Sequence, residues 1–109
     1  MAPWWRRAAR ENVLGDWYTT GECLACGAPE SVAPALFAPL TDSNFTTYFI
    51  QQPRTPADVA LACRAARVCC TAAVRYGGRE PAVLELLQDL PECTDHVLTK
   101  EGRVVRRRR

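Results

Sequence analysis

The sequence lacks several patterns, and each absence excludes a class of protein. It has no apolar run of the roughly 18 residues that a transmembrane helix needs, and its first residues, Met1–Arg7, lack the apolar segment of a secretory signal peptide. We therefore expect a soluble, cytoplasmic protein with no membrane partner. Aromatic residues make up only 8% of the 109 residues, which predicts one small domain with a thin core. No internal repeat is evident.

Histidine is almost absent too. The single histidine, His96, follows Cys93 in the polar C-terminal part of the chain, where we expect it to be solvated rather than to bind a metal. Hydrolytic catalysis is not expected, because no histidine lies near the other cysteines to activate a thiol. A thioredoxin-like redox site is not expected either, because the chain has no room for the larger sheet that this site requires. We expect that the protein is not itself an enzyme.

The body of the chain is short of positive charge. Residues 13–96 carry ten acidic and five basic side chains, a net charge of −5, whereas residues 1–12 contribute +2 and residues 97–109 contribute +5. An acidic body therefore has basic ends, and the last of them finishes in Arg106–Arg109. Such runs are usually solvated. Because no aromatic residue near this end could stack on bases, nucleic-acid binding is not expected.

What the sequence does contain is six cysteines. Thiols stay reduced in the cytoplasm, so this number favours metal binding or redox chemistry over disulfides. Cys23 and Cys26 form a C-x-x-C motif, which sets two sulfur ligands and several backbone N–H groups on one loop. Cys69 and Cys70 form a second cluster more than forty residues downstream. Zinc, an iron–sulfur cluster and a redox disulfide are all compatible with the C-x-x-C motif alone.

Composition and periodicity predict an α+β chain. We expect a strand over residues 16–20, a helical turn before Pro34, a strand over 45–50, a helix capped by Thr55 and a strand over 73–76. The capped helix carries a narrow stripe of small residues, namely Val59, Cys63, Ala66 and Cys70.

Beyond Gly78, the spacing of apolar residues predicts one more short amphipathic helix, beginning at Pro81 and ended by Pro91. Its apolar positions are Val83, Leu86, Leu87 and Leu90. The predicted organisation is a basic extension over residues 1–12, a domain over 13–78, this helix over 79–91 and a flexible basic tail over 92–109.

The order of elements, with these residues at the joints, resembles the small bacterial single-cluster ferredoxins. Those proteins carry C-x-x-C-x-x-C near the N-terminus and a remote cysteine, usually followed by proline and a short strand. Cys23 and Cys26 match the first two ligands, Cys69 matches the remote ligand, and Ala33–Phe37 matches a segment common after the first helical turn. The resemblance covers residues 13–78. It implies a ferredoxin-like fold with two helices and short antiparallel strands, and an iron–sulfur cluster that carries electrons between a reductase and an oxidoreductase.

The chain departs from the family pattern at two positions. The third ligand position is Pro29, which offers no thiolate, and the proline expected after the remote ligand is Cys70. Three thiolates would suffice for a [3Fe–4S] cluster, or for a [4Fe–4S] cluster with one iron bound to another ligand. Cys70 is the better candidate for that fourth ligand, because Cys63 would have to leave the helix stripe.

Two other interpretations stay open. Cys23, Cys26, Cys69 and Cys70 could instead hold a structural zinc ion, which takes four tetrahedral ligands. Alternatively, the ferredoxin-like domain binds no cluster and works by binding a partner protein. The pair Trp4–Trp5 and the basic ends would suit such a role.

Overall fold

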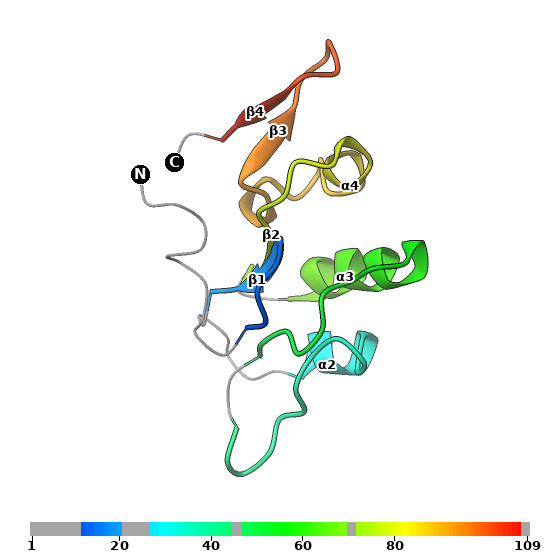
Figure 1. Ribbon diagram of the computed structural model, residues 1–109. Coiled ribbons are helices and arrows are strands. Elements are labelled where there is room, and N and C mark those ends of the chain that lie inside the picture. Colours follow the sequence, from blue (N-terminus) through cyan, green and yellow to red (C-terminus); the bar gives the residue numbers. More distant parts are fainter. Residues whose placement is uncertain (1–11, 21–26, 45–46, 70–71, 108–109) are drawn as a thin grey trace.

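Over the residues that the structure describes, the protein is an α+β chain of three α-helices and two antiparallel strand pairs, which confirms the predicted class. The computed structural model describes residues 12–20, 27–44, 47–69 and 72–107. Figure 1 shows the elements, which in chain order are β1 (Trp17–Thr19), α2 (Ala28–Val32), α3 (Pro56–Val68), β2 (Val74–Tyr76), α4 (Pro81–Leu86), the 3₁₀ helix η1 (Pro91–Cys93), β3 (His96–Leu98) and β4 (Val104–Arg106).

Strands β1 and β2 form the centre of the molecule. They pair in antiparallel register, with Tyr18 opposite Arg75, and the pairing extends one residue further where the Thr20 N–H donates to the Ala73 carbonyl at 3.0 Å. Both strands lie where the sequence predicts them. On its other edge β2 forms an isolated parallel bridge between Tyr76 and Thr94. This bridge joins the C-terminal part of the chain to the central strands.

Helix α3 begins as its sequence predicts. The Thr55 side chain accepts a hydrogen bond from the Asp58 N–H at 3.1 Å, and Pro56 occupies the first turn. Its buried face consists of small residues only, namely Ala62, Cys63, Ala65 and Ala66. Small side chains allow neighbouring backbones to approach closely, and α2 lies beside α3 in Figure 1.

The core between α3 and the strands is built around four aromatic rings. The Trp17 ring centroid lies 4.9 Å from that of Tyr76 and 6.2 Å from that of Phe49, and the Phe37 and Phe49 centroids are 4.4 Å apart. The rings are tilted against one another, the arrangement that aromatic quadrupoles favour. Four of the nine aromatic residues in the sequence thus gather in one cluster.

The predicted strand over residues 45–50 is not a regular strand in its described part, residues 47–50. Phe49 forms only an isolated bridge with Phe37, supported by hydrogen bonds from the Ile50 N–H to the Leu36 carbonyl and from the Ala38 N–H to the Tyr48 carbonyl. The partner segment lies between Pro34 and Pro39, which lack the N–H groups that a longer ladder needs. Residues 45–46 lie outside the described residues.

The predicted helix over residues 79–91 is shorter than expected. Helix α4 ends at Leu86, a turn follows over residues 87–89, and η1 begins at Pro91. Val83 and Leu87 are buried as predicted, but the Leu86 side chain is exposed.

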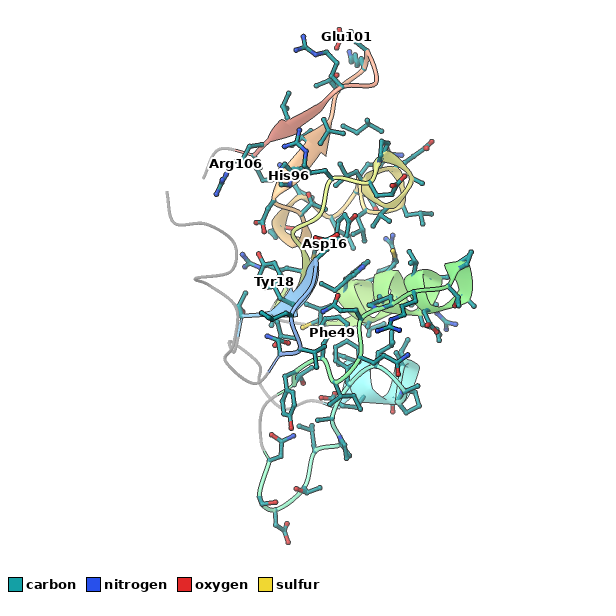
Figure 2. All side chains as sticks on the ribbon, in the orientation of Figure 1. Asp16, Tyr18, Phe49, His96, Glu101 and Arg106 are labelled. Carbon is teal, nitrogen blue, oxygen red and sulfur yellow. The ribbon has the colours of Figure 1, made fainter. Side chains whose placement is uncertain are left out.

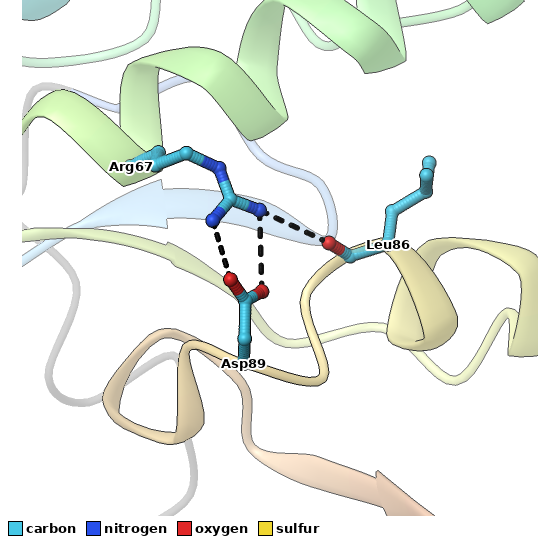
Figure 3. Close-up of polar contacts among 3 residues, drawn as sticks. All are labelled: Arg67, Leu86 and Asp89. Atoms are coloured by element: carbon cyan, nitrogen blue, oxygen red, sulfur yellow. Dashed lines mark hydrogen bonds and ion pairs between the residues drawn. The ribbon is translucent and has the colours of Figure 1, made fainter.

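A bidentate ion pair holds this early helix end against α3. Arg67, in the last turn of α3, donates from both terminal nitrogens to the Asp89 carboxylate at 2.5 and 3.2 Å, and one of them also contacts the Leu86 carbonyl at 3.4 Å (Figure 3). The Arg67 guanidinium holds the pKa of Asp89 below its usual range, chiefly through the hydrogen bond. Both side chains are about half exposed, so this pair orients the turn more than it stabilises the fold.

The chain after η1 differs from the expected flexible tail. Residues 96–106 form a hairpin in which β3 pairs with β4, with Val97 opposite Val105, and Gly102 adopts the left-handed conformation of a turn at φ +81°. His96, expected to be solvated, is only 9% exposed. Figure 2 shows His96 and Arg106 at the base of this hairpin.

A buried hydrogen bond fixes the hairpin to the central strands. The Tyr18 hydroxyl of β1 donates to Asp95 Oδ2 at 2.6 Å, and both side chains are almost fully buried. The Asp95 N–H donates to the Tyr76 carbonyl, and the Asp95 carbonyl accepts from the Arg107 N–H.

Within the described part of the chain, no helix is long and apolar enough to cross a membrane.

Candidate functional site

Cys69 lies at the point where α3 ends and the chain turns back into β2. Its N–H still donates to the Ala65 carbonyl, but its own backbone is extended. Three residues later Ala72 adopts a left-handed conformation with φ +54°, which is uncommon for a residue other than glycine. The turn brings the Ala73 N–H to 3.4 Å from the Cys69 sulfur. A backbone N–H that donates to sulfur stabilises the thiolate form, which is the form that binds metals.

The same turn is bonded to the strand that leads to the first two cysteines. Ala73, which donates to the Cys69 sulfur, also accepts the hydrogen bond from the Thr20 N–H. Thr20 is the last described residue before the segment that contains Cys23 and Cys26. The residue after this segment, Gly27, precedes α2, which packs on α3. Both ends of the C-x-x-C segment are therefore attached to the elements that surround Cys69.

Of the four predicted ligands, the structure describes only Cys69. Cys23, Cys26 and Cys70 lie outside the described residues. Among the described residues, no group of three or more histidine, cysteine, aspartate or glutamate side chains could hold a metal ion. Whether the three other thiolates meet Cys69 thus stays a prediction.

Pro29 has a structural role at the position where a third cysteine is expected. It lies in the first turn of α2, is fully buried, and its carbonyl accepts from the Ala33 N–H. Proline is well suited to this position because its fixed φ matches a helix start and its missing N–H would have no helical partner. Proline at this position therefore favours the helix start, and it offers no thiolate.

Glu30, the next residue, was missed by the sequence analysis. Its Oε2 accepts a hydrogen bond from the Thr47 hydroxyl at 2.5 Å, and its Oε1 is buried with no hydrogen-bond partner among the described residues. A buried carboxylate oxygen without a partner is costly. The sequence contained one usable signal, an acidic residue directly after Pro29.

Cys63 and Cys93 are buried thiols rather than members of this site. Cys63 faces the core from α3, and burial raises the pKa of its thiol, partly opposed by the charge of Arg67. A raised pKa disfavours the thiolate, so Cys63 is a poor metal ligand. Cys93 in η1 is also buried.

Comparisons with known proteins do not assign the chain to a family. The sequence matches no protein-family model, no curated protein and no solved structure.

Proposed function

We propose that the protein is a small electron carrier of ferredoxin type, in which Cys23, Cys26 and Cys69 hold an iron–sulfur cluster. The observation that supports this best is the hydrogen bond from the Ala73 N–H to the Cys69 sulfur. N–H groups directed at ligand sulfurs offset the negative charge of a cluster and help to set its reduction potential. When bound, the cluster would accept one electron from a reductase and release it to an oxidoreductase.

The vacant third position determines the type of cluster. With Pro29 unable to ligate, three thiolates suit a [3Fe–4S] cluster, or a [4Fe–4S] cluster whose fourth iron takes another ligand. We propose Cys70 as the first candidate for that ligand. Glu30, whose Oε1 is unpaired, follows Pro29 directly and is a second candidate, which would ligate through oxygen rather than sulfur.

Metal and sulfide analysis of the purified full chain tests this proposal. Anaerobic purification with iron, sulfide and zinc measured on one sample should give near-stoichiometric iron and sulfide. Zinc without iron would support the structural zinc site instead. The absence of both metals would support the partner-binding module. An electron paramagnetic resonance signal in the oxidised protein identifies the [3Fe–4S] form, because the oxidised [4Fe–4S] form of ferredoxins is diamagnetic.

Matched variants test the ligand assignment. Cys69→Ser should remove most of the iron. Cys63→Ala, in helix α3 six residues before Cys69, should retain it because that thiol faces the core. If Cys70→Ser removes the iron and Cys69→Ser does not, the remote ligand is Cys70 and the assignment of Cys69 is wrong.

A further inference from the structure

An open groove runs between α3 and α4, next to the start of β1. One end of it is a hollow of about 390 Å³ and the other end a hollow of about 320 Å³, and both are lined by Val59 of α3 and Val83 of α4. Because they share these wall residues, the two hollows adjoin, and we call them together the α3–α4 groove. Each hollow lies in the range of about 300–1,000 Å³ that accommodates a drug-sized molecule. Together they have room for several side chains of a peptide.

Hydrogen bonds hold the walls of this groove in place. The Gln52 side chain donates to the Trp17 carbonyl at 2.8 Å and accepts from the Trp17 N–H at 3.0 Å. The Tyr76 hydroxyl accepts from the Glu80 N–H at 3.2 Å, which fixes the start of α4 beside β2. On the opposite wall, the Thr55 cap fixes the start of α3. A partner that binds to a preformed groove loses less free energy to the ordering of its walls.

One end of the groove is negatively charged. Asp16, just before β1, and Glu80, just before α4, are exposed residues that line the larger hollow, and Figure 2 labels Asp16. Neither carboxylate has an ion-pair or hydrogen-bond partner among the described residues, and none of the described residues that line this hollow is basic. Burial raises the pKa of Tyr76, the hydrogen bond from Glu80 opposes this, and the charges of Asp16 and Glu80 add to it. Both carboxylates therefore lie near the same part of the groove.

The other end of the groove is apolar with a positive rim. Pro56, Ala82 and Leu86 line the smaller hollow and are exposed, and the Leu86 residue is 54% exposed. Exposed apolar side chains gathered in a concave surface are typical of a site that another molecule covers. Arg54 is the single basic residue among the described residues that line the groove. Negative charge, an apolar centre and one positive charge thus follow one another along it.

From this arrangement of charge we infer that the α3–α4 groove binds a peptide segment of a partner protein, with lysine or arginine at one end and large apolar side chains at the other. The basic side chains pair with Asp16 and Glu80, and the apolar side chains cover Leu86 and Val59. Arg54 repels a basic residue at the apolar end, so the charges of the peptide also set its direction. The inference does not depend on the proposed electron transfer, because no predicted cluster ligand lines the groove.

Isothermal titration calorimetry of the full chain with short peptides, acetylated and amidated at their ends, tests the charge pattern. Lys-Lys-Ser-Leu-Phe-Leu should bind with a dissociation constant of about 100 µM or tighter in about 50 mM salt, where exposed charges are weakly screened. Glu-Glu-Ser-Leu-Phe-Leu should bind at least about tenfold more weakly. Lys-Ser-Leu-Phe-Leu-Lys has the composition of the first peptide and should bind at least about threefold more weakly, because one lysine then meets Arg54. The inference is overturned if the first peptide does not bind or if either of the others binds equally well.

Variants of the groove locate the binding site of the first peptide. The double variant Asp16→Asn with Glu80→Gln should weaken binding at least about fivefold. Its matched control is Asp42→Asn with Glu85→Gln, which removes the same charge from exposed residues outside the groove lining. Equal losses in the two double variants would mean that only the overall negative charge attracts the peptide, which overturns the inference.

The apolar contact is tested in the same way. Leu86→Ala should weaken binding of the first peptide at least about threefold, since it removes exposed apolar surface from the groove. Val105→Ala is the control, because Val105 is similarly exposed, at 42%, but belongs to β4 and does not line the groove. If the two substitutions weaken binding equally, the peptide does not lie over Leu86 and the inference is overturned.

Two other occupants of the groove would give different results. Sedimentation velocity should show a monomer, and a dimer that dissociates on Leu86→Ala would mean that a second copy of the chain covers the groove. Residues Trp4–Arg7 of the chain also combine apolar and basic side chains. If the first peptide binds to the double variant Trp4→Ala with Trp5→Ala but not to the unmodified chain, this segment is the occupant. Either result overturns the inference of a partner protein.

Discussion

Replacing Tyr18 by phenylalanine tests whether the hairpin is held by the buried hydrogen bond between Tyr18 and Asp95. The substitution removes one oxygen and leaves the buried ring in place. Asp95 Oδ2, 2.6 Å from that oxygen, loses a donor in a place that water does not reach. A hydrogen bond to a charged group contributes about 1.5–3 kcal/mol. We therefore expect Tyr18→Phe to lower the free energy of unfolding by this amount.

Urea denaturation measures the effect. With a slope of about 1–3 kcal/mol per molar urea for small proteins, the midpoint should fall by about 1 M. Tyr48→Phe is the matched control, because Tyr48 is half-buried and its hydroxyl has no hydrogen-bond partner among the described residues. A change of about 0.5 kcal/mol or less is expected for it.

A double-mutant cycle separates the hydrogen bond from other effects of the substitution. Asp95→Asn should be destabilising alone. The double variant should lose less stability than the sum of the two single losses, because both substitutions weaken the same hydrogen bond. If Tyr18→Phe destabilises no more than Tyr48→Phe, or if the two effects at Tyr18 and Asp95 are additive, the hydrogen bond does not hold the hairpin and the reasoning is refuted.

Three further substitutions test local features. Gly15→Ala should lower the free energy of unfolding by about 1–3 kcal/mol in urea denaturation. The new Cβ would lie 2.3 Å from Cδ of Gln52, whose side chain is held by hydrogen bonds to β1. An unchanged midpoint would contradict this. Thr55→Ala should cost about 0.5–2 kcal/mol and Thr55→Ser much less, because serine keeps the cap on the Asp58 N–H; equal losses would show that the cap does not matter. Because the pKa of His96 is lowered in the folded protein, the unfolded chain binds a proton first as the pH falls. Stability should therefore fall as the pH drops through about 6.5. His96→Gln should reduce this dependence, and identical pH profiles of the two proteins would show that His96 does not cause it.

The elements that could be predicted from sequence are those specified by their own residues. Helix α3 carries its start signal in Thr55 and Pro56, and the strand at residues 17–19 is rich in β-branched and aromatic side chains. The irregular course of residues 47–50 could not be foreseen, because it depends on a partner segment bounded by two prolines. A strand needs a partner, and its own sequence does not reveal whether one exists.

The C-terminal hairpin was missed although its signals were present. Val97 and Leu98 are separated from Val104 and Val105 by a turn with Gly102, which is the pattern of a hairpin. The arginines around them suggested a solvated tail. The burial of His96 followed from the same tertiary packing, so its environment could not be read from the polar residues beside it in the sequence. At the candidate metal site, the sequence places Cys69 between the capped helix and the next strand, but it does not reveal the N–H donor to its sulfur or the unpaired Glu30 oxygen.

The pairing of β1 with distant parts of the chain bears on when the protein can fold during its synthesis. Tyr18 is opposite Arg75 in the sheet and bonded to Asp95 in the hairpin, so its partners are made 57 and 77 residues after it. Until the ribosome has released both, the strand that leads to Cys23 and Cys26 has no edge to pair with. Long-range pairing of this kind slows folding and prolongs the exposure of unpaired strands. A nascent chain should therefore be unable to complete this sheet and its bond to the hairpin until the residues around Asp95 have emerged.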